Sequence, residues 1–164
     1  MTVDARFSLW RQWAERSQLP GLEFPGVYVI AITKAQLHGK PFAWRRDIVY
    51  VGMTNAVGGL SGRLRQFDLT ISGKRLAHGG ADRVRQSHKQ YNRLVSRLLV
   101  AVRSVKCNVT SGAVRDLLLM GRVAQFEFQC LARYVEHFSR LPLFNDKARS
   151  PKYSASNRSQ GVGN

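Results

Sequence analysis

Two short apolar runs of similar composition stand out in the first third of the chain. Residues 26–33 read GVYVIAIT, and residues 47–54 read DIVYVGMT. Short runs rich in Val, Ile and Tyr are typical of buried strands. The polar stretch between them contains Gly39 and Pro41, which favour a turn. The pattern therefore predicts an antiparallel hairpin with a loop of moderate length.

Apolar residues recur every three or four positions in other segments. This spacing predicts a helix at about 4–17, where Phe7, Trp10 and Trp13 share a face, and another from about Leu60. Further along, the chain predicts a helix at 84–98, a third strand at 98–106, and a helix at 111–140 that is either continuous or broken near Gly121.

The order of these elements predicts one small α/β or α+β domain with a three-stranded, antiparallel or mixed sheet flanked by helices. We expect an N-terminal helix within residues 1–20 and the body of the domain at 24–146. Residues 147–164 contain few apolar side chains, and we expect this tail to be disordered.

We expect the protein to be cytoplasmic, and to be associated with the nucleoid if its source is prokaryotic. Its 164 residues contain no apolar run long enough to span a membrane, and its first residues do not resemble a secretory signal. Cys107 and Cys130 are far apart, without a C-x-x-C pair. We therefore expect two reduced thiols rather than a zinc site.

The positive net charge is the feature of the composition that says most about a binding partner. The chain has 26 Lys and Arg against 10 Asp and Glu, a formal net charge of +16, which predicts a polyanionic partner such as DNA. Between residues 59 and 106, only Asp68 and Asp82 oppose a long series of basic residues. The candidate phosphate contacts in this stretch are Arg65, Lys74, Arg75, Arg83, Arg85, Lys89 and Arg93.

Within this frame, five landmarks occur in order and resemble the GIY-YIG nuclease family. They are GVY at 26–28, YVG at 50–52, Arg63, Glu127 and Asn145. The resemblance covers most of the chain and implies a metal-dependent endonuclease, a hydrolase of DNA phosphodiester bonds. It also implies one divalent ion, Mg²⁺ or Mn²⁺. Cleavage of both strands by such a domain would need a dimer or a second event.

The resemblance assigns a role to each landmark. Tyr28 and Tyr50 would sit side by side across the hairpin, with one phenol acting as general base or orienting the attacking water. Arg63 would fork onto the scissile phosphate, which suits a planar guanidinium. Glu127 would hold the metal ion, and Asn145 would brace the site by hydrogen bonds. Gly26 and Gly52 complete the two triads, where the absence of a Cβ permits close approach.

The glutamate can also be argued from the residues. The chain has four Glu residues, so a carboxylate after the third strand must be Glu127 or Glu136. Glu127 falls on an apolar helical stripe with Val123 and Leu131, where a carboxylate is costly unless it is paired or metal-bound. Glu136 lies among polar residues, which predicts a surface ion pair. We therefore favour Glu127.

Two points depart from the family pattern or compete with it. Many members have a histidine four residues after the arginine, where this chain has Phe67. His78, between small residues in LAHGGADR, is the candidate substitute, and an exposed loop histidine is the alternative. A basic nucleic-acid-binding module without catalysis would explain the charge equally well, as would a structural protein of a ribosome or nucleoid. The binding module would not require Glu127 on an apolar face. The structural protein would have a long basic tail, whereas the tail from Lys147 is only modestly basic.

Overall fold

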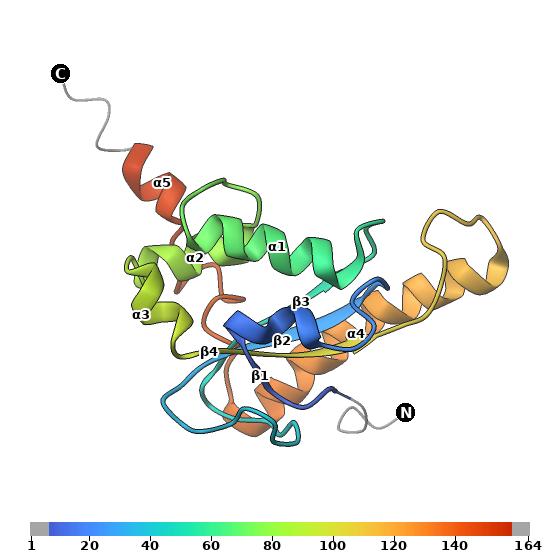
Figure 1. Cartoon of the computed structure of the whole chain (residues 1–164), viewed down its shortest axis with the longest axis horizontal. Coiled ribbons are helices and arrows are strands. Elements are labelled where there is room, and N and C mark those ends of the chain that lie inside the picture. Colours follow the sequence, from blue (N-terminus) through green and yellow to red (C-terminus); the bar gives the residue numbers. More distant parts are fainter. Residues whose placement is uncertain (1–6, 159–164) are drawn as a thin grey trace.

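The computed structural model describes residues 7–158 and is an α+β fold around a four-stranded antiparallel sheet (Figure 1). The strand order is β1-β4-β2-β3. The strands are β1 (Arg11–Gln12), β2 (Gly26–Ile32), β3 (Ile48–Thr54) and β4 (Leu98–Ser104). The expected hairpin of β2 and β3 is confirmed, and its register pairs Tyr28 with Gly52 and Ile30 with Tyr50.

Helices cover both faces of this sheet. On one face lie α1 (Gly59–Ile71), α2 (Gly79–Ser87) and the short α3 (Tyr91–Val95), and on the other lies α4 (Val114–Phe138) (Figure 1). Strand side chains alternate between the two resulting cores, so that Tyr28 and Ile30 pack toward α1 while Val27 and Val29 pack toward α4. Burial on both faces explains why the strands are almost continuously apolar.

The predicted three-stranded sheet is wrong by one strand, and so is the predicted N-terminal helix. Residues 11–12 form β1, paired with β4 at Val100 and Leu99, and a 3₁₀ helix, η1 (Trp13–Gln18), follows. Trp10 and Trp13 explain the difference because they are buried in cores on opposite faces of the sheet. A single amphipathic helix presents one apolar stripe and cannot fill both cores.

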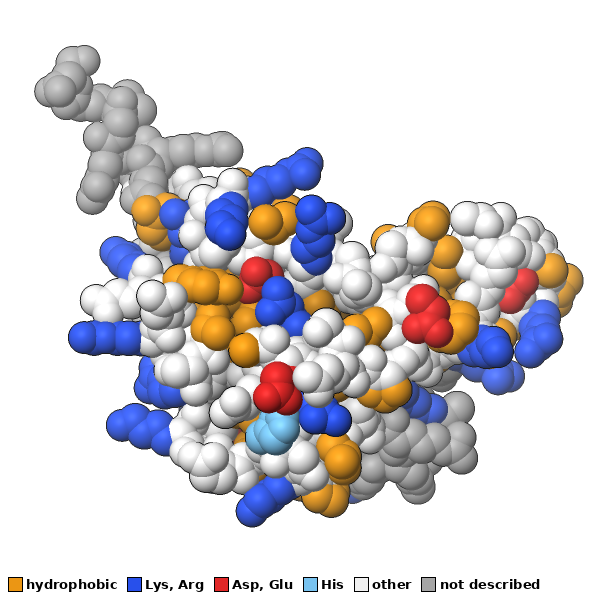
Figure 2. Space-filling model, viewed as in Figure 1, with side chains coloured by type: hydrophobic (Ala, Val, Ile, Leu, Met, Phe, Trp, Pro, Cys, Tyr) orange, Lys and Arg blue, Asp and Glu red, His pale blue; other side chains and the backbone are white. Residues whose placement is uncertain are grey.

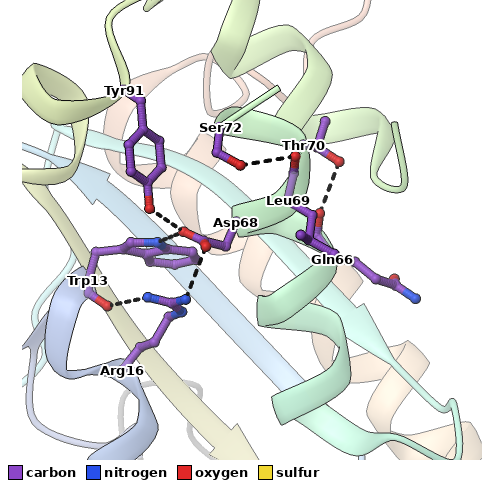
Figure 3. A network of polar contacts seen from close by, with 8 residues as sticks. All are labelled: Trp13, Arg16, Gln66, Asp68, Leu69, Thr70, Ser72 and Tyr91. Atoms are coloured by element: carbon purple, nitrogen blue, oxygen red, sulfur yellow. Dashed lines mark hydrogen bonds and ion pairs between the residues drawn. The ribbon is translucent and has the colours of Figure 1, made fainter. Parts of the chain in front are cut away.

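Asp68 of α1 fixes this N-terminal segment against the α1 side of the sheet (Figure 3). Its carboxylate accepts hydrogen bonds from Trp13 Nε1 at 2.7 Å and from the Tyr91 hydroxyl at 2.9 Å, and it lies 3.2 Å from Arg16 Nη2. Arg16 also donates to the backbone oxygen of Trp13 at 2.9 Å. The segment therefore belongs to the same folded unit as the sheet.

The C-terminal tail is more ordered than its composition predicts, at least through residue 158. It forms α5 (Tyr153–Arg158), and Ser154 Oγ donates to Asp82 of α2 at 2.6 Å. Arg83 donates to the backbone oxygen of Ser150, and the Arg85 guanidinium lies 3.9 Å from the centre of the Tyr153 ring. Polar and cation–π contacts replace the missing apolar residues. The remainder of the predicted disordered tail, 159–164, lies outside the described residues.

α4 is one continuous helix of 25 residues, without a break at Gly121. Instead of one helix over 84–98, the structure has α2 beginning at Gly79, then α3, and β4 beginning at Leu98. Among residues 7–158, no helix combines the length and apolarity needed to cross a membrane.

Candidate active site

The two motif tyrosines meet on the α1 side of the sheet. Tyr28 on β2 and Tyr50 on β3 occupy diagonal positions across the hairpin, with ring centroids 6.0 Å apart. Tyr28 is fully buried, whereas Tyr50 is partly exposed. The side-by-side placement expected from the sequence is therefore present, and only Tyr50 has access to solvent.

Two glycines make room for these rings. A Cβ on Gly52 would lie 2.5 Å from Tyr28 Oη, and a Cβ on Gly80 would lie 2.5 Å from Tyr50 Cζ. Real Cβ atoms essentially never approach so closely, so a side chain at either position would force the neighbouring ring to move. Gly26 is different, because a Cβ there would collide with the Arg103 carbonyl of β4. Gly26 therefore allows β2 and β4 to approach each other closely.

His78 is bonded directly to Tyr28. It is 2% exposed, its Nε2 lies 2.6 Å from Tyr28 Oη, and its Nδ1 accepts a hydrogen bond from the Ala81 N–H at 3.1 Å. Because Nδ1 is an acceptor, the neutral ring carries its proton on Nε2 and donates it to Tyr28. Burial, and then the charge of Arg63, lower the pKa of His78 to about 3.

The alternative of an exposed loop histidine is therefore wrong, because His78 is the buried N-cap of α2. Phe67, which lies four residues after Arg63 where the family pattern often has a histidine, is also fully buried. Its ring centroid lies 5.1 Å from that of His78 and 6.1 Å from that of Tyr50. Phe67 thus packs against the imidazole of His78, which caps the N-terminus of α2.

Arg63 of α1 connects these groups. It is close enough to Tyr28 for a side-chain hydrogen bond, and its charge acts on Tyr50, His78 and Glu127. Its Nη1 donates to Gln66 at 3.1 Å, while its buried Nε has no partner in the described part of the chain. Arg65 is exposed to solvent. We refer to Tyr28, Tyr50, Arg63, His78 and Glu127 as the tyrosine cluster.

Burial dominates the ionisation of the phenols. It raises the pKa of Tyr28 well above its ordinary value, more than the neighbouring Arg63 lowers it. The pKa of Tyr50 is also raised by burial, against the opposing effect of Arg63. A phenol with a pKa above 10 is neutral at pH 7. Both tyrosines are therefore protonated in the free protein, and a phenolate forms only where further positive charge enters.

Glu127 is the carboxylate of the cluster. It is half-buried on α4, with its carboxylate near the backbone of Met53 on β3. Burial raises its pKa, although Arg63 and the Met53 N–H act in the opposite direction. Glu136, the alternative considered from the sequence, is exposed and lies 3.2 Å from Arg133 Nη1. The surface ion pair expected of Glu136 is thus present.

Asn145 braces the outer edge of β3. Its Nδ2 donates to the Val51 carbonyl at 2.8 Å, and its Oδ1 accepts from the Val51 N–H at 2.8 Å. Next to it, the Phe144 N–H donates to the Val49 carbonyl at 2.9 Å. These bonds satisfy backbone groups that an edge strand leaves unpaired. Asn145 therefore fixes the backbone between Tyr50 and Gly52, as a bracing role requires.

Most of the candidate phosphate contacts are free to meet a ligand. In Figure 2, Lys and Arg side chains are spread over the part of the surface where Figure 1 shows α1, α2 and α3. Arg83 and Arg85 are half-buried and held by the C-terminal segment through the contacts given above, so they have a structural role. The exposed members are Arg65, Lys74, Arg75, Lys89 and Arg93.

The resemblance implies one divalent metal ion, and the residues at the site fit only one kind of coordination. Within residues 7–158, no three His, Cys, Asp or Glu side chains lie together as a metal cage. Zn²⁺ and Ca²⁺ sites usually need such a set. Mg²⁺ keeps several waters and is commonly held by one or two carboxylates together with substrate phosphate. Glu127, half-buried beside Arg63, suits that arrangement.

Two contributors to the cluster were not identified from the sequence. The tight fit of Gly80 against Tyr50 could have been suspected from the GG pair after His78, but its partner lies on a distant strand. The contact between the Met53 backbone and Glu127 leaves no signal in side-chain identities. Both depend on how α2 and α4 pack against the sheet.

Comparison of the chain with protein-family models, with curated proteins and with solved structures finds no match to any of them.

Proposed function

We propose that this protein is a metal-dependent endonuclease that hydrolyses DNA phosphodiester bonds in the manner of the GIY-YIG nucleases. One observation carries the proposal: the rings of Tyr28, Tyr50 and His78 meet with centroids 5.7 to 6.2 Å apart. Arg63 of α1 lies close enough to act on these three groups and on Glu127 of α4. Arginine beside a carboxylate and a hydroxyl group supplies what phosphodiester hydrolysis requires, namely charge neutralisation and positioning of water.

In this mechanism Arg63 binds the scissile phosphate. Its Nε has no partner in the described chain, and a guanidinium matches two phosphate oxygens in a forked geometry. Tyr50, the tyrosine with solvent access, holds the attacking water through its Oη. Glu127 would hold Mg²⁺ or Mn²⁺, which supplies a Lewis acid when bound.

Tyr28 and His78 act on Tyr50 without touching the substrate. His78 donates to Tyr28 Oη, so the Tyr28 hydroxyl proton is free to point to Tyr50. With Tyr28 as the donor, the contact between the two phenols lowers the pKa of Tyr50 and raises that of Tyr28. The chain of donors from His78 through Tyr28 would thus stabilise negative charge on Tyr50 when a metal ion adds positive charge to the site.

DNA fits the charge of the protein. A formal net charge of +16 favours a polyanion through release of counterions, so binding weakens steeply as salt rises. The exposed basic residues of α1 to α3 belong to the same side of the sheet as the tyrosine cluster. Phosphates held there would lie on the side from which Tyr50 is accessible.

The test is a plasmid-cleavage assay. Supercoiled DNA is incubated with the protein in Mg²⁺, in Mn²⁺ or in EDTA, alongside Glu127→Gln and the matched control Glu136→Gln. We expect metal-dependent nicking by the wild type and by Glu136→Gln, and retention of DNA binding without cleavage by Glu127→Gln. DNA that is bound but uncut in every condition would support the non-catalytic binding module instead. Cleavage by Glu127→Gln would refute the assignment of the carboxylate.

A further inference from the structure

Helix α4 has two apolar faces, and the sheet covers only one of them. Val123, Phe126, Cys130 and Tyr134 are buried against the strands. On the other side, Val114 is 74% exposed, Leu118 60% and Phe128 70%. Leu117 and Val135 are exposed as well, at 52% and 38%. Large apolar side chains gathered on one exposed surface usually mark an interface.

The exposed apolar residues lie on one face of the helix, where Gly121 and Gln125 separate Leu118 from Phe128. At 3.6 residues per turn, positions 114, 117, 118, 121, 125, 128, 132 and 135 share a face. We call this face the α4 stripe. It spans about 32 Å at a rise of 1.5 Å per residue, and its first turns project beyond the sheet (Figure 1), where apolar side chains are visible on the surface (Figure 2).

We propose that two copies of this chain pair through their α4 stripes as antiparallel helices related by a two-fold axis. In such an antiparallel pair, a residue of one helix lies beside a residue of the other when the two residue numbers add up to a fixed value. The pairs Gly121 with Phe128, Leu117 with Ala132, and Val114 with Val135 all satisfy one and the same sum. Two of these pairs set a large side chain against a small one. The stripe is therefore complementary to itself, as an isologous dimer interface requires.

Charge agrees with the same register. Arg115 and Glu136 are exposed, near opposite ends of α4, and on the same side of the stripe. Two-fold pairing brings Arg115 of each copy within reach of Glu136 of the other. The basic side chains of α1 to α3 lie beyond the opposite face of the sheet, so their charge is kept away from the contact, whereas Arg122 of α4 is exposed beside the stripe.

The pairing leaves both tyrosine clusters open. Glu127 lies on the flank of α4 that turns toward Met53 and away from the stripe. In a two-fold antiparallel pair, the two Glu127 carboxylates then lie toward the same side of the dimer. If the proposed nuclease function holds, two sites could act on one duplex. The dimer itself rests on α4 alone and is tested separately from cleavage.

Sedimentation over a range of protein concentrations tests the dimer directly. We expect a reversible dimer of the wild-type chain and at least about tenfold weaker association for Phe128→Arg, since a central apolar residue is removed and a charge is introduced. Leu76→Arg is the matched control, because Leu76 is a 57% exposed apolar residue away from α4, and it should not change the dimer. A wild-type chain that stays monomeric throughout would overturn the proposal, as would a dimer insensitive to Phe128→Arg.

Charge reversal tests the register. Arg115→Glu and Glu136→Arg should each weaken the dimer, and the double variant should restore it. Gln125 lies near the two-fold axis, so Gln125→Cys in a Cys107→Ser background should form a disulfide-linked dimer under mild oxidation. Absence of rescue together with absence of the cross-link would overturn the antiparallel register.

Discussion

The two faces of the sheet share the same strands but carry different chemistry. On the α4 face, Val27, Val29 and Ala31 of β2 meet apolar residues of one long helix. The intervening residue Tyr28 points to the α1 face and meets His78. The thiol of Cys130 on the α4 face is buried, and burial raises its pKa to about 12, so it is chemically inert at neutral pH. The α4 face is therefore mainly apolar, whereas the α1 face holds polar groups in a defined geometry.

The difference follows from the elements that cover each face. A long helix lays an apolar stripe on the strands, and a cavity lined by Val27, Val123 and Phe126 opens beside it. The α1 face is covered by shorter helices joined by glycine-containing turns, and there the backbone at Gly80 approaches the Tyr50 ring closely. Short elements leave backbone groups free to bond side chains, as the Ala81 N–H bonds His78.

The largest effect should come from Arg63, the residue that joins the α1 face to α4. We expect Arg63→Ala to lower the rate of DNA cleavage by about 10²–10³-fold, because a preorganised donor to the phosphate is lost. The exposed neighbour Arg65→Ala should change the rate little and weaken binding most at low salt, because one contact that releases a counterion is lost. Single-turnover rates and binding isotherms at two salt concentrations separate these outcomes. Equal loss of rate in both variants would contradict the central position of Arg63.

Neighbouring residues of β2 should separate function from stability. Tyr28→Phe removes a donor to Tyr50 and should lower the cleavage rate by roughly tenfold to a hundredfold, as loss of a hydrogen bond to a developing charge predicts. Val29→Ala, on the α4 face, should lower the free energy of unfolding by about 2 kcal/mol and leave the rate unchanged. Denaturant titrations and cleavage rates of both variants measure the two effects, and similar losses of rate and stability in the two variants would contradict the difference between the faces.

Stability should depend on pH through His78. Its pKa is about 3 in the folded protein against 6.5 ordinarily, so the unfolded chain binds the extra proton first. Stability from this residue is complete above pH 6.5 and is lost as pH falls toward 3, by about 2 kcal/mol between pH 7 and pH 5. His78→Asn, which retains an N-cap acceptor, should remove this slope. Parallel pH dependences of the two proteins would contradict the buried neutral histidine.

The smallest effects concern two glycines of the α1 face. At Gly62, a Cβ would meet no atom within 4 Å, so Gly62→Ala should stabilise α1 by about 0.5–1 kcal/mol. Gly80→Ala should instead displace the Tyr50 ring and lower the cleavage rate while the protein remains folded. Thermal unfolding and cleavage assays compare the two. A fully active Gly80→Ala variant would show that the position of the Tyr50 ring is not critical.

The N-terminal segment and the tail show where sequence patterns fail. Helical spacing of Phe7, Trp10 and Trp13 predicts a helix, but Trp10 and Trp13 fill two different cores. Periodicity reports only that residues are apolar, not which core receives them. Likewise, the few apolar residues after 147 do not reveal that Arg85 and Asp82 hold Tyr153 and Ser154.

The sequence by itself indicated the paired strands and the helical segment at 111–140, because apolar runs and their spacing are local properties of the chain. Its resemblance to the GIY-YIG family supplied the candidate residues of the site. The sequence also favoured Glu127 over Glu136, since a carboxylate on an apolar stripe can be recognised from spacing. Only the tertiary structure decided that His78 rather than residue 67 reaches Tyr28, that its tautomer makes it a donor, and that burial keeps both phenols neutral. These properties depend on which distant groups surround an atom, and helix packing sets those neighbours.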